Sequence, residues 1–191
     1  MVKVPRPGRV KTRLAREVGA VPAAWWFRHQ VRALLRRLRD PRWETVLAVA
    51  PDADGLASRA WPGDLRRVPQ GPGDLGDRMA RLLRTGRGPA CIVGADVPGI
   101  DRARIAEAFA ALGAAPSVVG PAPDGGYWLV GLRRAAAPPA GLLRGVRWST
   151  RHARADTEAT LPGPVAHAAT LADVDTAADL RAVTGSLAAR A

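Results

Sequence analysis

Segments whose apolar residues recur at helical spacing alternate along this chain with short apolar runs of strand character. The clearest helical pattern is Val31, Leu34, Leu35 and Leu38, which recur at i, i+3, i+4 and i+7 with arginines between them. The clearest strand patterns are TVLAVA at 45–50, ACIVGA at 90–95, SVVG at 117–120 and YWLVGL at 127–132. Such alternation is typical of a mostly parallel sheet covered by helices. The sequence therefore predicts a three-layer α/β/α sandwich.

Residues that cap helices stand at the start of several of the helical segments. Asp, Ser and Thr side chains accept hydrogen bonds from the first free backbone N–H groups of a helix. The candidates are Asp74 or Asp77, Asp101, Ser149 or Thr150, and Asp175 or Thr176. The stretch PDADG at 51–55 has the composition of a loop, and 165–169 is predicted to be the last strand.

The length of 191 residues suits one domain with a continuous core, so we expect a single domain over 1–191. A hydrophobic fraction of 47% with 24% charged residues argues against wholesale disorder. No run approaches the ~20 apolar residues that span a bilayer, and no membrane association is expected. The single cysteine, Cys91, cannot form an internal disulfide, which favours a cytoplasmic location.

The net charge of +12 would suit a nucleic-acid partner, because clustered Lys and Arg neutralise phosphates. Only Lys3 and Lys11 are lysines, however, so 27 of the 29 basic residues are arginine. They accompany a high content of Ala, Gly and Pro, which is the pattern of a GC-rich coding sequence. We therefore attribute the charge to composition and expect no nucleic-acid partner. The sequence does not define the oligomeric state.

A basic, glycine-containing loop opens the chain and leads into the first helical segment. Glycine lets the backbone approach a ligand closely, and Lys and Arg supply positive charge to phosphates. The spacing is not that of a P-loop, and a solvated basic turn is the alternative to phosphate binding. The residues expected to bind phosphate are Arg6, Gly8, Arg9, Lys11 and Arg13.

Asp96 ends the apolar run ACIVGA, at the edge of the sheet where ligands bind in folds of this kind. Mg²⁺ usually takes only one or two protein carboxylates, and phosphate oxygens complete its shell. Helix capping is the alternative role, but Asp101 is better placed for it. The residue pattern therefore favours Asp96 as a ligand of Mg²⁺ or Mn²⁺.

Two other acidic segments precede predicted elements. Asp124-Gly125-Gly126 forms a turn before the strand that begins at Tyr127, which suits either a strand-entry turn or a backbone laid against a ligand. Asp173-Val174-Asp175 precedes the last helix, where capping is favoured over a metal role on local grounds. The three histidines have neither metal-ligand spacing nor a paired nucleophile, so neither a zinc site nor a serine hydrolase is supported.

Six segments resemble, in order and spacing, a bacterial family of GT-A-fold nucleotide-diphospho-sugar transferases. They are KVPRPGRVKTRL, QGPGDLGDRM, GADVPGID, GPAPDGGYWLVGL, WST and DVDTAADL, which extend from Lys3 to Leu180. The family includes arsenosugar-biosynthesis glycosyltransferases. The chain is more distantly similar to the molybdenum cofactor guanylyltransferase and phospholactate guanylyltransferase families. The resemblance implies a GT-A, Rossmann-like sandwich with a mostly parallel central sheet.

The resemblance also implies how a nucleotide is bound. The opening loop with Arg9, Lys11 and Arg13 would hold the phosphates of the nucleotide. Gln70 and Gly71 lie where members of the family contact the base or the ribose. No role follows for the WST segment.

The resemblance further implies the position of the metal and of the acceptor. Asp96 matches the metal-binding carboxylate of GT-A enzymes, and Asp175 would add a second carboxylate to a Mg²⁺ or Mn²⁺ site. Asp124, Gly125, Gly126 and Tyr127 would border the transferred group or the acceptor. Lys11, Asp96 and Asp124 are accordingly the residues expected to take part in catalysis.

The reaction implied by the resemblance is metal-dependent transfer of a sugar from a nucleotide-diphospho-sugar to a small-molecule acceptor. The alternative is a nucleotidyltransferase that releases pyrophosphate from a nucleoside triphosphate, although its relatives generally have a more glycine-rich opening loop. A third reading is a degenerate basic binding domain without activity. The base, the sugar, the acceptor and the stereochemistry of transfer do not follow from the sequence.

Only Met1 to Val4 precede the opening loop, where members of the family have a full apolar strand. The first strand of a doubly wound sheet is central, and strands usually have ~5 to 6 residues. Losing it would leave backbone groups of its neighbours unpaired. We therefore expect a truncated first strand, and we expect in-frame codons upstream of Met1 to encode further apolar residues such as Val, Leu and Ile.

Overall fold

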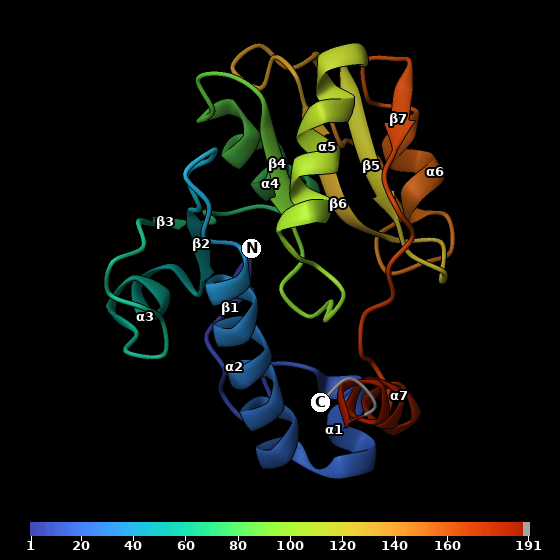
Figure 1. Cartoon of the computed structure of the whole chain (residues 1–191). Helices are drawn as coiled ribbons and strands as arrows, with labels where there is room; N and C mark the ends of the chain where they lie inside the picture. The colour runs from blue at the N-terminus through green and yellow to red at the C-terminus, as the bar shows by residue number, and fades with distance from the viewer. Residues whose placement is uncertain (189–191) are drawn as a thin grey trace.

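The computed structural model describes residues 1–188, which form a layer of β-strands with helices on both faces (Figure 1). Three parallel strands form one sheet in the order β1-β2-β3: β1 is Val2–Lys3, β2 is Leu47–Ala50 and β3 is Arg67–Pro69. A second sheet has the order β4-β6-β5-β7: β4 is Ala90–Val93, β5 is Ser117–Pro121, β6 is Tyr127–Leu132 and β7 is Val165–His167. Here β6 runs antiparallel to β4 and β5, whereas β7 runs parallel to β5.

The helices connect these strands and cover the sheets. They are α1 (Thr12–Val18), α2 (Ala20–Arg37), α3 (Asp52–Ala57), α4 (Leu75–Arg84), α5 (Arg102–Ala114), α6 (Ala153–Glu158) and α7 (Ala177–Ala188). Figure 1 shows α5 in front of the four-stranded sheet and α4 behind it, while α1 and α7 lie together beyond the lower edge of that sheet. The expected three-layer α/β/α sandwich is confirmed.

Period-two alternation in the strands separates two hydrophobic cores. Val118 and Val119 are adjacent in β5 and both are fully buried, yet they belong to different cores on opposite faces of the sheet. Val118 packs in the core that includes Ile105 and Leu112 of α5. Val119 packs in the core that includes Leu83 of α4. A strand buried on both faces reads as a continuous apolar run, which explains the SVVG pattern.

The helix caps follow the sequence at three of the four expected positions. Asp74 accepts the N–H of Asp77, and the Asp77 side chain accepts the N–H of Asp74 in return, so both candidates of α4 take part in one capping box. Asp101 accepts the N–H of Arg104 at the start of α5. At the start of α7 the hydroxyl of Thr176 accepts the N–H of Asp179.

The local predictions for the segments 51–55 and 149–152 were wrong. The stretch PDADG is not a loop, because α3 begins at Asp52. The helix expected to start at Ser149 or Thr150 begins only at Ala153. Ser149 has a φ of 61°, which is left-handed and outside the extended region that a capping residue adopts. Asp156 holds this segment as turns, since it accepts the backbone N–H and the guanidinium of Arg147.

The two sheets face each other at the edges formed by β1 and β4. The first strand is short, as expected, and spans only two residues. The α-amine of Met1 donates to the carbonyl oxygen of Val93 at the end of β4, at 2.8 Å. β2 starts at Leu47 rather than at Thr45, so its predicted first two residues lack a strand partner among the described residues.

Within residues 1–188, no helix combines the length and the apolar character needed to cross a membrane.

Candidate functional site

Lys11 turns inward at the end of the opening loop. Its backbone is left-handed, with φ 46° and ψ 50°, at the residue that precedes α1. A residue other than glycine in the left-handed backbone region costs about 1 to 2 kcal/mol of conformational free energy, so other contacts must stabilise it. The side chain is only 6% exposed, although it carries an ammonium group. The backbone geometry thus serves to bury a charge next to the sheet.

Three carboxylates from two distant segments surround the Lys11 ammonium. Its Nζ lies 2.6 Å from Oδ2 of Asp96, 2.7 Å from Oδ1 of Asp175 and 3.3 Å from Oδ2 of Asp173. Arg13 approaches from the solvent side and donates to Oδ2 of Asp175 at 2.8 Å. We call Lys11, Arg13, Asp96, Asp173 and Asp175 the acidic cluster.

Packing of α1 against the segment before α7 brings Lys11 and Arg13 close to Asp173 and Asp175. Leu14 of α1, Ala23 of α2 and Val174 form a small buried core with residues of α7 around it. Val174 is only 1% exposed, whereas the carboxylates of Asp173 and Asp175 on either side of it both point away from that core toward the Lys11 ammonium. The backbone N–H of Val174 also donates to the carbonyl oxygen of Asp96, which joins this segment to the end of β4.

The cluster shifts the ionisation of its members. Burial lowers the pKa of Lys11, but the attraction of Asp96, Asp175 and Asp173 is larger in sum and raises that pKa above its ordinary value. Burial is the main influence on Asp173 and raises its pKa. Burial also disfavours ionised Asp175, but hydrogen bonds from Lys11 and Arg13 prevail and lower its pKa. Lys11 is therefore a permanently charged partner of the carboxylates at neutral pH.

The chemistry of the carboxylates suits a hard divalent cation. Asp96 and Asp175, the two expected metal ligands, lie on the same ammonium, and each keeps about 30% of its side chain exposed. Oxygen donors around a single cation are what Mg²⁺ and Mn²⁺ require. In the arrangement seen here the central position is taken by Lys11. Among residues 1–188, no group of three or more His, Cys, Asp or Glu is spaced as a metal shell.

The remaining cations of the opening loop lie outside the cluster. Arg6 pairs with Asp54 at the start of α3, at 2.9 Å. Arg9 is exposed, and its guanidinium makes neither a hydrogen bond nor an ion pair with the residues that the structure describes. Gly8 has a φ of 74°, and a Cβ there would meet no atom within 4 Å. The loop thus offers one cation and open backbone at its tip.

Gln70 is turned into the protein. It is 4% exposed, and its Nε2 donates to the carbonyl oxygens of Val2 and Ala48. The backbone N–H groups of Gln70 and Gly71 donate to the carboxylate of Asp52. Of the two residues expected to contact the base or the ribose, the Gln70 side chain is therefore engaged within the sheet.

The turn Asp124-Gly125-Gly126 lies at the same end of the four-stranded sheet as Asp96. This is because β6 runs antiparallel to β4, so the start of β6 lies beside the end of β4. Asp124 is exposed and accepts the N–H of Gly126. Gly125 has a φ of 86°, and a Cβ there would meet the backbone oxygen of Arg151. The hydroxyl of Tyr127 is hydrogen-bonded to Thr157, and burial raises the Tyr127 pKa. No described contact joins this turn to the acidic cluster.

The sequence reasoning missed Asp173 as a member of the cluster. It treated Asp173-Val174-Asp175 mainly as a capping segment, whereas capping of α7 falls to Thr176. The signal was present in the alternation of the segment. A buried apolar residue between two aspartates in extended backbone places both carboxylates on one side.

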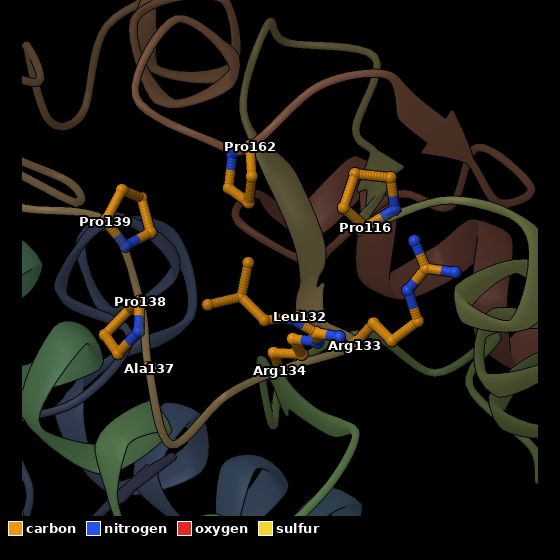
Figure 2. A pocket seen from close by; sticks show the side chains of 8 residues that line it. All are labelled: Pro116, Leu132, Arg133, Arg134, Ala137, Pro138, Pro139 and Pro162. Carbon is orange, nitrogen blue, oxygen red and sulfur yellow. The ribbon is translucent and has the colours of Figure 1, made fainter.

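A cavity of about 610 Å³ lies at the opposite edge of the four-stranded sheet. Figure 2 shows the prolines and arginines that line it, among them Pro116, Arg133, Arg134, Pro139 and Pro162. It lies at the start of β5 and the end of β6, whereas Asp96 and Asp124 lie at the other ends of these strands. None of the residues predicted from the sequence to bind substrate lines this cavity.

Comparison with known structures supports the fold. The chain is similar to the crystal structure of a "putative nucleotide-diphospho-sugar transferase" from Desulfovibrio desulfuricans G20. The identity is 29%, over 95% of this chain and 83% of that one, with a TM-score of 0.83. Rv0371c from Mycobacterium tuberculosis H37Rv shares the fold, with 17% identity over 95% of this chain and 92% of that one, and a TM-score of 0.54.

A comparison with curated proteins found no match. A family model does match, over residues 33–150, which is more than half of the chain. This region includes β2 to β6 and Asp96, but not the opening loop or the segment before α7. The chain therefore belongs to the bacterial family described as "Uncharacterized protein conserved in bacteria (DUF2064)".

Proposed function

We propose that this protein is a glycosyltransferase that moves a sugar from a nucleotide-diphospho-sugar to a small-molecule acceptor, with a divalent cation. The observation that supports it most is the acidic cluster, in which Lys11 and Arg13 meet three carboxylates at the end of β4. Similarity to the Desulfovibrio protein described as a "putative nucleotide-diphospho-sugar transferase" supports the same class of reaction.

In this proposal the diphosphate lies on the basic side of the cluster. Lys11 and Arg13 would bind its oxygens, and Arg9 would reach it from the tip of the opening loop. Negative charge grows on the nucleoside diphosphate as the sugar leaves, and fixed cations beside it stabilise that transition state. Lys11 would exchange at least one of its carboxylate contacts for a phosphate oxygen.

The carboxylates released by Lys11 are the proposed ligands of the cation. Asp96 and Asp175 would hold Mg²⁺ or Mn²⁺, which would add positive charge beside the diphosphate when bound. In the absence of the ion, the Lys11 ammonium offsets the repulsion between these carboxylates. The ion and the ammonium would thus compete for the same oxygens.

The acceptor is proposed to bind beside the turn at 124–126 and Tyr127. One oxygen of Asp124 accepts the N–H of Gly126, and the other has no hydrogen-bond partner among the described residues. A free carboxylate oxygen can accept a hydrogen bond, and then the proton, from an acceptor hydroxyl. Asp124 would act in this way, and Gly125 and Gly126 have no side chains that would block the approach of the acceptor to it.

A thermal-shift panel of nucleotides and nucleotide-sugars with Mn²⁺ tests the proposal. A ligand at ~100 times its dissociation constant adds about 2.7 kcal/mol to the free energy of unfolding, which is easily measured. Asp96→Asn should abolish the Mn²⁺-dependent part of the shift. Asp64→Asn is the matched control, because within residues 1–188 Asp64 pairs only with Arg39 and both side chains are more than half exposed. Equal shifts in both variants would refute the metal assignment.

Product analysis separates the proposal from the two alternatives. A glycosyltransferase releases a nucleoside diphosphate from its nucleotide-sugar when an acceptor is present. Release of pyrophosphate from a nucleoside triphosphate would instead establish a nucleotidyltransferase. Salt-sensitive binding of RNA or DNA that Asp96→Asn leaves unchanged would point to a basic binding domain without activity.

A further inference from the structure

The cavity at the start of β5 and the end of β6 has walls made largely of proline. Its volume of about 610 Å³ is within the range of sites for small molecules. Figure 2 shows Pro138 and Pro139 on one side of Leu132 and Pro116 on the other, and Pro162 completes the set. Proline fixes its own φ and has no N–H group. Such walls are stiff and mainly apolar.

Two of these walls are connected to β5 by hydrogen bonds. Pro116 stands between Ala115 and Ser117, which are both buried, and its carbonyl oxygen accepts the backbone N–H of Arg133. The hydroxyl of Ser117 donates to the carbonyl oxygen of Pro162 at 2.6 Å. Because these contacts lie within the protein, this side of the cavity is formed before any ligand binds.

The wall on the other side is a short bridge over residues 136–140. Ala135 before the bridge and Leu142 after it are both buried in the core that α4 covers. Pro138 and Pro139 lie between these two anchors, and they are half-buried beside the cavity. The bridge is therefore held at both ends, and its prolines remain available to a ligand.

The charged side chains of the lining, as far as residues 1–188 show, are two arginines. Arg133 donates from Nη1 to the carbonyl oxygen of Gly113, near the end of α5, at 3.2 Å. Arg134 is exposed, and its guanidinium makes neither a hydrogen bond nor an ion pair with the described residues. A bound anion would meet the guanidinium of Arg134 without displacing an internal carboxylate.

This cavity is separate from the acidic cluster. Leu132 lines the cavity at the end of β6, whereas Tyr127 starts that strand beside the turn with Asp124. A strand of this length spans roughly 17 Å, at about 3.4 Å per residue. A single small molecule therefore does not occupy both places.

We propose that this cavity binds a small organic anion, which is a flat apolar ring system with one carboxylate or phosphate group. The anionic group pairs with Arg134, and Arg133 adds positive charge beside it. The ring lies against the prolines, whose C–H groups form an apolar surface. An inorganic anion leaves this surface in water, and a neutral ring leaves the guanidinium without a partner, so both parts of the ligand contribute. Binding of this kind is independent of the transferase activity proposed above.

Titration of the isotope-labelled full chain with four probes, followed by NMR without a metal ion, tests the site. The probes α-naphthyl phosphate and α-naphthoate combine the ring with an anionic group, α-naphthol lacks the charge, and inorganic phosphate lacks the ring. The backbone amides of Leu132, Arg134 and Ala137 should shift with a Kd of about 1 mM or lower for at least one naphthyl anion. The tighter of the two identifies the anionic group.

The two incomplete probes should bind at least about tenfold more weakly than the preferred naphthyl anion. Absence of shifts at these amides with both naphthyl anions would overturn the proposal. An affinity for α-naphthol or for inorganic phosphate equal to that of the naphthyl anions would also overturn it, because one part of the ligand would then contribute nothing.

Three variants locate the bound probe. Arg134→Gln should weaken binding of the preferred naphthyl anion by about tenfold, since it removes the unpaired guanidinium. Arg144→Gln is the matched control, because Arg144 is exposed in the same connection between β6 and α6 but does not line the cavity. Arg9→Gln at the opening loop should leave the affinity unchanged. Equal affinities in Arg134→Gln and Arg144→Gln, or a loss in Arg9→Gln, would show that the probe binds elsewhere.

Discussion

The ammonium of Lys11 lies 2.6 Å from Oδ2 of Asp96 and joins the loop before α1 to the loop after β4. Lys11→Met would leave three carboxylates facing one another without their cation. We expect a loss of about 2 kcal/mol in the free energy of unfolding at neutral pH, less than for a fully buried pair because the carboxylates are partly exposed. The loss should shrink toward pH ~4, where aspartates begin to take up protons. Urea unfolding at both pH values measures it.

Lys3→Met is the matched control for this variant. Lys3 is the only other lysine, it is exposed, and it makes no ion pair with the described residues. Its replacement should change stability by no more than about 0.5 kcal/mol. Equal losses in the two variants, or a Lys11→Met loss that does not depend on pH, would contradict the assigned role of Lys11.

The same substitution should tighten the binding of Mn²⁺ in the absence of nucleotide. The ammonium occupies the point on which Asp96 and Asp175 converge, so its removal frees these oxygens and strengthens the local negative potential. An increase in affinity of about tenfold would correspond to about 1.4 kcal/mol of relieved competition. Isothermal titration calorimetry measures it, and Asp96→Asn in the Lys11→Met background should reverse the gain. Unchanged or weaker binding would mean that the cluster does not hold the ion.

The buried α-amine of Met1 should make stability depend on pH between about 6 and 8. Burial is the main cause that lowers its pKa from 8.0 to about 6. Between these values the unfolded chain is protonated and the folded chain is not, so the unfolded state binds more protons and stability rises with pH. The rise should reach about 2 to 3 kcal/mol, complete above pH ~8 and absent below pH ~6.

Urea unfolding at several pH values measures this rise, with intact mass confirming that Met1 is retained. The control is the N-terminally acetylated protein, which keeps the three histidines but lacks the titrating amine. Acetylation should remove the rise, and a rise of the same size in both proteins would assign it to other groups.

Gly125→Ala should destabilise the turn before β6 for two reasons. The residue has a φ of 86°, and a Cβ would meet the backbone oxygen of Arg151, which cannot move as a flexible side chain does. We expect a loss of about 2 to 4 kcal/mol. Gly141→Ala separates the two causes, because Gly141 has a φ of 81° but no atom within 4 Å of its Cβ. Its loss should be about 1 kcal/mol, and comparable losses in the two variants would exclude the steric contact.

Much of the fold was predictable because its signals are local. The adjacent apolar residues Val118 and Val119 indicate a strand buried on both faces. The spacing of Ile105, Ala108 and Leu112 indicates a helix with one buried side. Asp101 caps its helix by a hydrogen bond three residues away, so no distant contact is needed to predict it. The local prediction was wrong where a contact between residues farther apart determines the structure. Asp156 accepts a hydrogen bond from Arg147, and α6 begins only at Ala153.

The sequence by itself determined the α/β alternation, the helix caps of α4 and α5, and the position of Asp96 at the end of a strand. Only the tertiary structure decided what these residues face. Lys11 meets Asp175 from 164 positions away, Asp173 joins them because Val174 is buried, and Gln70 points into the sheet. Such partners depend on how α1, β4 and the segment before α7 pack together. Local periodicity does not predict that packing, because it reflects only residues that are close in sequence.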